Sequence, residues 1–115
     1  MNPESIESSQ MDLSKFHQLQ QQLKDWSFSG QHHMHKSWRF RHAQQALKWH
    51  GLAKALSAGH GGDCYFYLGH VGSGRIETDI LNHQQGHLIR EDLEVALMMD
   101  RLEDDVKGAD TAVQS

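Results

Sequence analysis

Ten histidines among 115 residues are the most distinctive chemical feature of this sequence. Imidazole titrates near neutral pH, so a histidine can move a proton in a reaction or bind a transition metal. Two groups of histidines are candidates for such chemistry. The first comprises His32, His33 and His35; the second comprises His60, His70, His83 and His87, with Asp63 and Cys64 between them.

The imidazoles of either group could bind a metal ion if enough of them converged. On a strand, His33 and His35 share one face and His32 lies on the other, so only two of the first group can converge. The second group has no spacing typical of a metal motif. We therefore expect neither a bound metal nor a cofactor.

The single cysteine, Cys64, excludes an internal disulfide and a cysteine-rich zinc finger. With no basic residue beside it, we expect a small buried side chain rather than a nucleophile. Glycines 59–62 and 69–74 lack the Gly-Lys-Ser/Thr ending of a phosphate-binding loop.

Charge and hydropathy exclude several broad classes. Eleven basic and fifteen acidic residues give a net charge of −4, which argues against a nucleic-acid-binding protein. No apolar run approaches the ~20 residues that a membrane-spanning helix needs. Residues 1–14 have neither a basic start nor an apolar stretch, so we predict no signal peptide and a cytoplasmic location.

The first half of the chain predicts a helix, two strands and a second helix. Phe16, Leu19 and Leu23 form one stripe of a helix over 15–24. A short strand at 26–29 and a glycine turn lead to a strand over 34–41, and the two read as a hairpin. A helix follows from about residue 42 to 59, with its apolar positions spaced three and four apart.

The second half predicts two strands and a last helix. Residues 64–71 are apolar on both faces, which favours an interior strand, and residues 76–80 alternate in polarity. The last helix should run from about 89 to 102. Its apolar arc over 95–102 is too wide for one stripe, so we expect a second copy to cover it, or an open sheet edge to pair, in a homodimer.

This order is α-β-β-α-β-β-α, and it predicts an α+β fold: a four-stranded antiparallel sheet with helices packed on one face. The other face should carry Arg39 and Arg41 opposite acidic residues such as Glu77 and Asp79. We expect one domain over 14–104, with disordered tails at 1–13 and 105–115.

Over residues 26–102 the chain resembles the pterin-4a-carbinolamine dehydratases. The segment Trp38–Trp49 is similar to the aromatic strand and central helix of that family. Ile76–His83 resembles its strand that ends in Thr-His, and Gly86–Asp92 resembles the Gly-Leu-Thr-x-x-Asp start of its last helix. The resemblance implies the same α-β-β-α-β-β-α fold.

The family's active-site signature is only partly present. Where the family has His-His-Pro after its central helix, this chain reads Ala58-Gly59-His60-Gly61-Gly62-Asp63-Cys64. At most one of the two histidines is left, as His60, and the proline is missing. Asn82 and Ile89 replace threonines of the two later segments. Dehydration of a carbinolamine needs a proton donor and a proton acceptor, and the resemblance assigns these catalytic roles to His60 and His83.

Two functions follow from this resemblance. The broken signature resembles a divergent non-catalytic branch, the RuBisCO assembly factors of carboxysome-containing bacteria. We expect a non-catalytic homodimer that assists assembly of a protein client, with RuBisCO as the expected client. The alternative is an active 4a-hydroxytetrahydropterin dehydratase that serves pterin recycling.

Overall fold

The computed structural model describes residues 14–70 and 72–114, with side chains as far as residue 108. In chain order it contains a helical segment at 14–22, β1 (Ser27–Ser29), β2 (His33–Arg39), α2 (Ala43–Ser57), β3 (Asp63–Leu68), β4 (Arg75–Leu81) and α3 (Arg90–Gln114). The predicted order α-β-β-α-β-β-α and the α+β class are confirmed.

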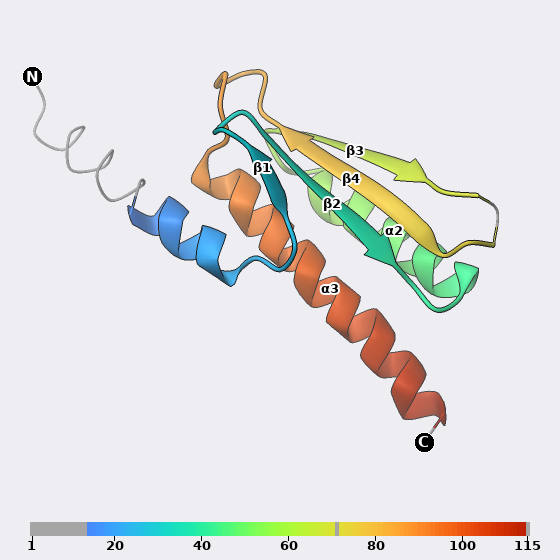
Figure 1. The fold of residues 1–115 in the computed structure, drawn as a ribbon. Helices are drawn as coiled ribbons and strands as arrows, with labels where there is room; N and C mark the ends of the chain where they lie inside the picture. The colour runs from blue at the N-terminus through green and yellow to red at the C-terminus, as the bar shows by residue number, and fades with distance from the viewer. Residues whose placement is uncertain (1–13, 71, 115) are drawn as a thin grey trace, which may run out of the picture.

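The four strands form one antiparallel sheet in the order β1-β2-β4-β3 (Figure 1). Alternate residues of β2 and β4 point to opposite faces, as the sequence pattern predicts, and Met34, Trp38, Ile76 and Ile80 are all fully buried. The prediction of an interior strand at 64–71 is wrong, because β3 lies at the sheet edge. Its side chains Tyr65, Tyr67 and Leu68 are exposed.

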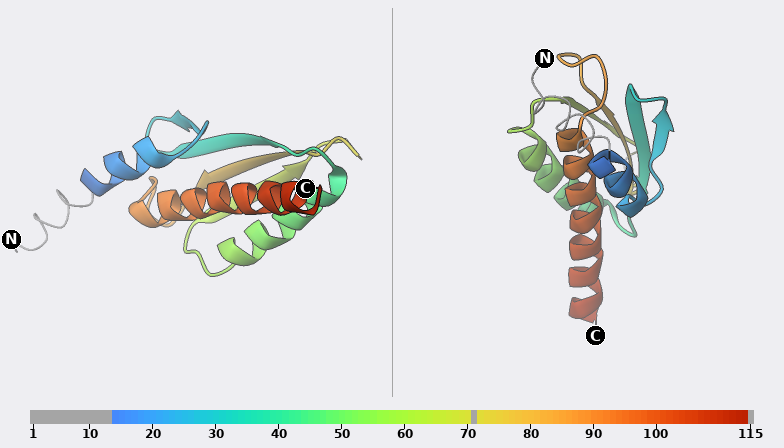
Figure 2. Two further views of the ribbon diagram at one scale, coloured as in Figure 1. Left: turned by 90° about the horizontal axis from the view of Figure 1, so that it is seen from below. Right: turned by 90° about the vertical axis from the view of Figure 1, so that its left-hand side faces the viewer.

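Both long helices cover the same face of the sheet, and no helix of the described residues covers the other, open face (Figure 2). The core between the two layers is built around Trp38 and Trp49, whose ring centroids lie 4.3 Å apart. Each indole N–H has a partner, since Trp38 donates to Thr78 Oγ1 at 2.9 Å and Trp49 donates to the Met99 carbonyl at 3.1 Å. Both buried indole N–H groups are therefore hydrogen-bonded, as buried tryptophans usually are.

One charged pair is buried inside this layer. Lys36 Nζ lies 2.7 Å from Asp100 Oδ1, with side-chain exposures of 4% and 3%. The same carboxylate accepts hydrogen bonds from the Trp26 indole N–H and the Lys24 backbone N–H, both at 3.1 Å. Asp100 thus ties α3 to β2 and to the chain that precedes β1.

The last helix is longer than predicted. It continues to Gln114 instead of ending at Leu102. Val106 is 4% exposed, and Lys107 pairs with Glu103 at 2.9 Å, so the disordered tail predicted for 105–115 is wrong at least for 105–108. The tail predicted at 1–13 lies outside the described residues.

The wide apolar arc of α3 is mostly used inside the chain. Val95, Ala96 and Met99 are buried, and Met98 is 43% exposed. The arc therefore packs mainly on this chain's own sheet and on α2, so it does not need a second copy to cover it. Within the described residues, no helix combines the length and the apolar character that crossing a bilayer requires.

Candidate functional site

The two histidines predicted as catalytic lie at the same end of the sheet. His60 lies in the short loop between α2 and β3, and His83 comes two residues after the end of β4. The first residue of β3, Asp63, pairs with the last residue of β4, Leu81, so the two histidine-bearing loops are neighbours. The start of α3 closes this end through Asp92.

His60 is enclosed in the protein. Its side chain is 3% exposed, and its Nε2 lies 2.6 Å from Oδ1 of Asp92, a fully buried carboxylate. The two atoms are within ion-pair distance, but their alignment gives Nε2 no hydrogen bond among the described residues. On the other side of the ring, Nδ1 lies 3.7 Å from the Cys64 sulfur.

Asp92 also organises the start of α3. Its Oδ2 accepts hydrogen bonds from the Ile89 backbone N–H at 2.8 Å and from Asn82 Nδ2 at 3.1 Å. Ile89 has no side-chain oxygen that could accept a hydrogen bond from the first turn of this helix. Asp92, three residues later, accepts the backbone N–H of Ile89 itself. The sequence showed Asp92 as a motif residue, but its pairing with the distant His60 could only be seen in the fold.

Gly62 makes room for this buried pair. A Cβ atom at this position would collide with Asp92 Oδ1 and would lie 2.6 Å from His60 Cε1. Gly61, its neighbour, has open space around it. The glycines that replace the expected His-Pro of the signature thus include one that the enclosure of His60 requires.

His83 has the opposite environment. Its side chain is 69% exposed, and its Nδ1 lies 2.6 Å from Asp63 Oδ2. The His83 backbone N–H also donates to this oxygen at 3.2 Å. The backbone hydrogen bond from His83, followed by the bond from its ring, lowers the pKa of Asp63. Asp63 therefore orients an imidazole that faces solvent.

Cys64 is unsuited to nucleophilic chemistry. Burial, followed by the negative charges of Asp92 and Asp63, raises the pKa of its thiol to about 11. A thiol with this pKa is protonated at neutral pH and does not attack as a thiolate.

The remaining histidines belong to neither carboxylate–imidazole pair, although His33 and His87 lie at or near the same end of the sheet. His70 lies beyond the far end of β3, and the His87 ring contacts the backbone carbonyl of Leu88 at 3.0 Å. On the open face, His33 and His35 both contact Asp79 Oδ1, at 2.6 and 2.7 Å. In the part of the chain that the structure describes, no three His, Cys, Asp or Glu side chains are grouped so as to hold a metal ion.

Chemically, the site combines two carboxylate–imidazole pairs of different accessibility. The pair His83–Asp63 can exchange a proton with a bound molecule, because its ring is in solvent. The pair His60–Asp92 is shielded from any ligand in the described arrangement. The two predicted histidines are thus brought to one end of the sheet, but each is held by a different carboxylate.

Comparison with known proteins supports the fold. No protein-family model matches the sequence, and no curated protein matches it significantly. Among solved structures, the chain is similar to a "transcriptional coactivator/pterin dehydratase" from Brucella melitensis, with a TM-score of 0.66 and 14% sequence identity. The match covers 78% of this chain and 94% of the other. The likeness shows a pterin dehydratase-like fold.

Proposed function

We propose that this chain is a binding protein of dehydratase-like fold that assists assembly of another protein and does not dehydrate pterins. The observation that carries the proposal is the enclosure of His60, at 3% exposure and in contact with the fully buried Asp92. A general acid or base must reach the proton that it transfers, within hydrogen-bond distance or through one water. Because the His60 ring is buried below the protein surface, it does not meet this condition.

Loss of one of two proton-transfer groups removes most of the catalysis expected from this fold. A positioned acid or base contributes about 10²- to 10⁴-fold to a rate. Of the two histidines to which the resemblance assigns catalysis, only His83 has an accessible ring. The Brucella protein is named both a coactivator and a dehydratase, so a protein of this fold is described in terms of partner binding as well as catalysis.

For the client we keep the proposal drawn from the resemblance: RuBisCO, in carboxysome-containing bacteria. Co-expression of the large and small RuBisCO subunits with and without this chain tests it, with assembled holoenzyme measured on native gels and by carboxylase activity. We expect more holoenzyme in the presence of the chain. An unchanged yield would reject RuBisCO as the client.

One observation favours the alternative, an active 4a-hydroxytetrahydropterin dehydratase. His83 is exposed and is oriented by Asp63 at 2.6 Å, an arrangement that suits an acid–base group. A direct assay of carbinolamine dehydration separates the two functions. We expect no turnover above the uncatalysed rate.

The variant His83→Ala and its control His17→Ala complete the assay. His17 is exposed on the helical segment 14–22, and its ring packs beside Phe16. Turnover by the native chain that is lost in His83→Ala and kept in His17→Ala would establish the dehydratase and overturn the binding-protein proposal.

A further inference from the structure

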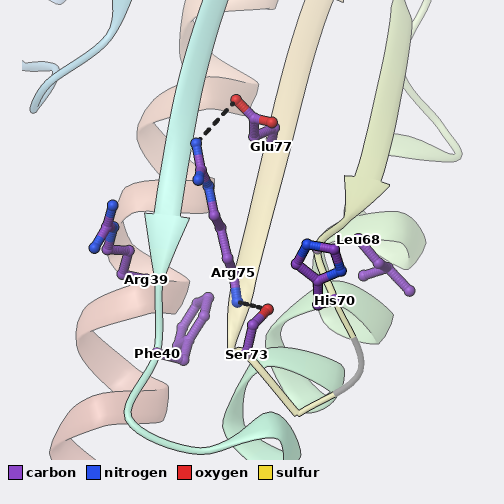
Figure 3. A pocket seen from close by; sticks show the side chains of 8 residues that line it. Arg39, Phe40, Leu68, His70, Ser73, Arg75 and Glu77 are labelled. Carbon is purple, nitrogen blue, oxygen red and sulfur yellow. Dashed lines mark hydrogen bonds and ion pairs between the residues drawn. The ribbon is translucent and has the colours of Figure 1, made fainter.

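A basic hollow lies at the opposite end of the sheet from His60 and His83. It has a volume of about 700 Å³ and is lined by Arg39 and Phe40 at the end of β2, Leu68 and His70 after β3, and Ser73 and Arg75 before β4 (Figure 3). None of these residues takes part in the site described above. The hollow opens on the sheet end where the β3–β4 turn folds back.

Two arginines oppose each other in this hollow. Arg39 and Arg75 are direct partners in the antiparallel register of β2 and β4. Like charges directly opposite each other on neighbouring strands destabilise a sheet. In Figure 3 the Arg39 side chain points away from Arg75, as expected from the repulsion between two cations. Among the described residues Arg39 has no ion-pair partner.

One carboxylate only partly compensates these charges. Glu77 Oε1 lies 3.7 Å from Arg75 Nη2, but the same oxygen is 3.3 Å from His35 Nε2 and accepts from Ser37 Oγ at 3.2 Å. Among the residues that line the hollow, two arginines and one glutamate give a net positive charge, in a chain whose overall charge is −4. The excess of about one unit suits a carboxylate group better than a doubly charged phosphate.

The backbone around the hollow is fixed by close contacts. The Phe40 N–H donates to the Gly74 carbonyl at 2.7 Å, and the Gly69 N–H donates to the Arg75 carbonyl at 2.8 Å. A Cβ at Gly69 would lie 2.9 Å from Ser73 Oγ, and one at Gly74 would collide with the Phe40 carbonyl. The turn can therefore approach the strand ends only with glycine at these positions, and it holds the two arginine-bearing strand ends in place.

We propose that this hollow is the docking site for an acidic segment of a protein partner, whose Asp or Glu carboxylate binds between Arg39 and Arg75. Guanidinium groups bind carboxylates through paired N–H donors. The partner is a protein segment rather than a free metabolite, since small-molecule sites enclose most of their ligand and this hollow is lined mainly by exposed side chains. Leu68 and Tyr67, 53% and 54% exposed, continue the surface with apolar area for the residues beside the carboxylate.

This inference rests on the proposed function in taking the partner to be the client. Its first test uses the full ¹⁵N-labelled chain and an acetylated, amidated hexaglutamate peptide. We expect amide shifts at residues 69–75 and an affinity that falls about tenfold in Arg39→Gln and in Arg75→Gln. The matched control is Arg101→Gln, which removes the same charge from an exposed position on α3 and should leave the affinity unchanged.

Several outcomes would overturn the site. These are no binding of hexaglutamate at millimolar concentration, equal binding of hexaglutamine, or an equal loss of affinity in Arg101→Gln. Inorganic phosphate that shifts the same amides with equal or higher affinity would replace the acidic segment with a phosphate ligand. Because both arginines are exposed, thermal unfolding should show that the variants fold, with a melting temperature no lower than that of the native chain.

The second test asks whether the hollow serves the client. We expect the double variant Arg39→Gln/Arg75→Gln to lose the gain in assembled RuBisCO that the native chain provides. If the gain persists while hexaglutamate no longer binds, the docking role is wrong and the proposed function stands. If the native chain turns over pterin, the proposed function fails, whereas the peptide titration still decides whether the hollow binds a carboxylate.

Discussion

His60 and His83 carry the same imidazole in opposite surroundings, and at the scale of single residues this difference determines what each can do. The enclosed ring contacts Asp92 and Cys64, whereas the exposed ring is held by Asp63. The sequence pattern predicts that both histidines lie in loops next to strands. Their solvent exposure, however, is set by packing between distant segments. Burial of His60 depends on α3, which begins far along the chain, so no local pattern could have revealed it.

Cys64 offers a test of this enclosure. Burial and two neighbouring carboxylates raise the pKa of its thiol to about 11, so the native thiol should react with Ellman's reagent at pH 8 more than about tenfold slower than the unfolded chain in urea. Rates measured with and without 6–8 M urea (about the range that unfolds small domains) give the comparison. Equal rates would mean that this end of the sheet is open.

Asp79 gives a prediction for pH. Partial burial acts to raise the pKa of Asp79, but hydrogen bonds from His35 and His33, together with their charges, outweigh it and lower the pKa below 3.8. A lowered pKa in the folded state stabilises the fold above the unfolded value, and this contribution is lost as the pH falls through the folded pKa. We therefore expect Asp79→Asn to lose less free energy of unfolding between pH 5 and pH 3 (a window about the unfolded value) than the native chain.

Urea titrations at both pH values measure the difference. The effect should stay below about 1 kcal/mol, because Asp79, His33 and His35 are partly exposed to solvent, at 21–33%. Asp104→Asn, at an exposed aspartate whose partner is Lys24, is the control. Identical losses for native chain and Asp79→Asn would show that the two histidines do not stabilise the Asp79 carboxylate.

At the scale of elements, the alternation in 34–40 and 76–80 predicted which faces of two strands are buried. That signal is local, since successive side chains of a strand point to opposite faces. The edge position of β3 was missed because its residues are apolar on both faces, which is typical of an interior strand, and strand order depends on contacts distant in sequence. The extension of α3 beyond Leu102 was missed because acidic residues there resemble a tail.

The loop between α2 and β3 yields a matched pair of variants. Gly62→Ala should destabilise the fold by about 1–3 kcal/mol, because the new methyl group would meet buried His60 and Asp92 atoms that have no room to move. Gly61→Ala is the control, since nothing lies within 4 Å of its Cβ. Unfolding in urea measures both. Equal stabilities would argue that the His60–Asp92 contact is not tightly packed.

The attachment of α3 to the sheet depends on the buried pair Lys36–Asp100. Asp100→Ala should cost about 3–5 kcal/mol, because the buried Lys36 ammonium group loses its 2.7 Å contact and keeps the Glu103 carboxylate at 3.9 Å. Replacement of both, as Lys36→Met/Asp100→Leu, should restore much of that loss. Asp104→Ala on the same helix removes only an exposed contact with Lys24 and should cost less than about 1 kcal/mol. A small effect of Asp100→Ala would contradict the burial of this pair.

At the scale of the whole molecule, the resemblance predicted the arrangement of helices and sheet, which the structure confirms. The homodimer stays a prediction, and of its two predicted locations the open sheet edge is now favoured. The arc of α3 is largely used within the chain. Among the described strands, β3 lies at the sheet edge with β4 as its one neighbour, and it exposes Tyr65 and Tyr67. An unpaired edge strand is a ready site for pairing with a second copy.

We therefore expect light scattering to find a dimer at micromolar concentration. Tyr67→Lys should shift the chain toward monomer, because an edge lysine opposes strand pairing. Leu47→Lys, on the outer side of α2 at 58% exposure, is the control. If the native chain is a monomer, or if only Leu47→Lys dissociates it, pairing through β3 is wrong.

The tryptophans have a practical consequence. All three indoles of the chain lie in one cluster. The Trp26 and Trp38 centroids are 5.7 Å apart, and the Trp38 and Trp49 centroids are 4.3 Å apart. No indole lines the basic hollow. Intrinsic tryptophan fluorescence thus reports on the integrity of the core, and a ligand bound in the hollow should change it very little. A spectral change during a titration would therefore indicate unfolding of the core rather than binding.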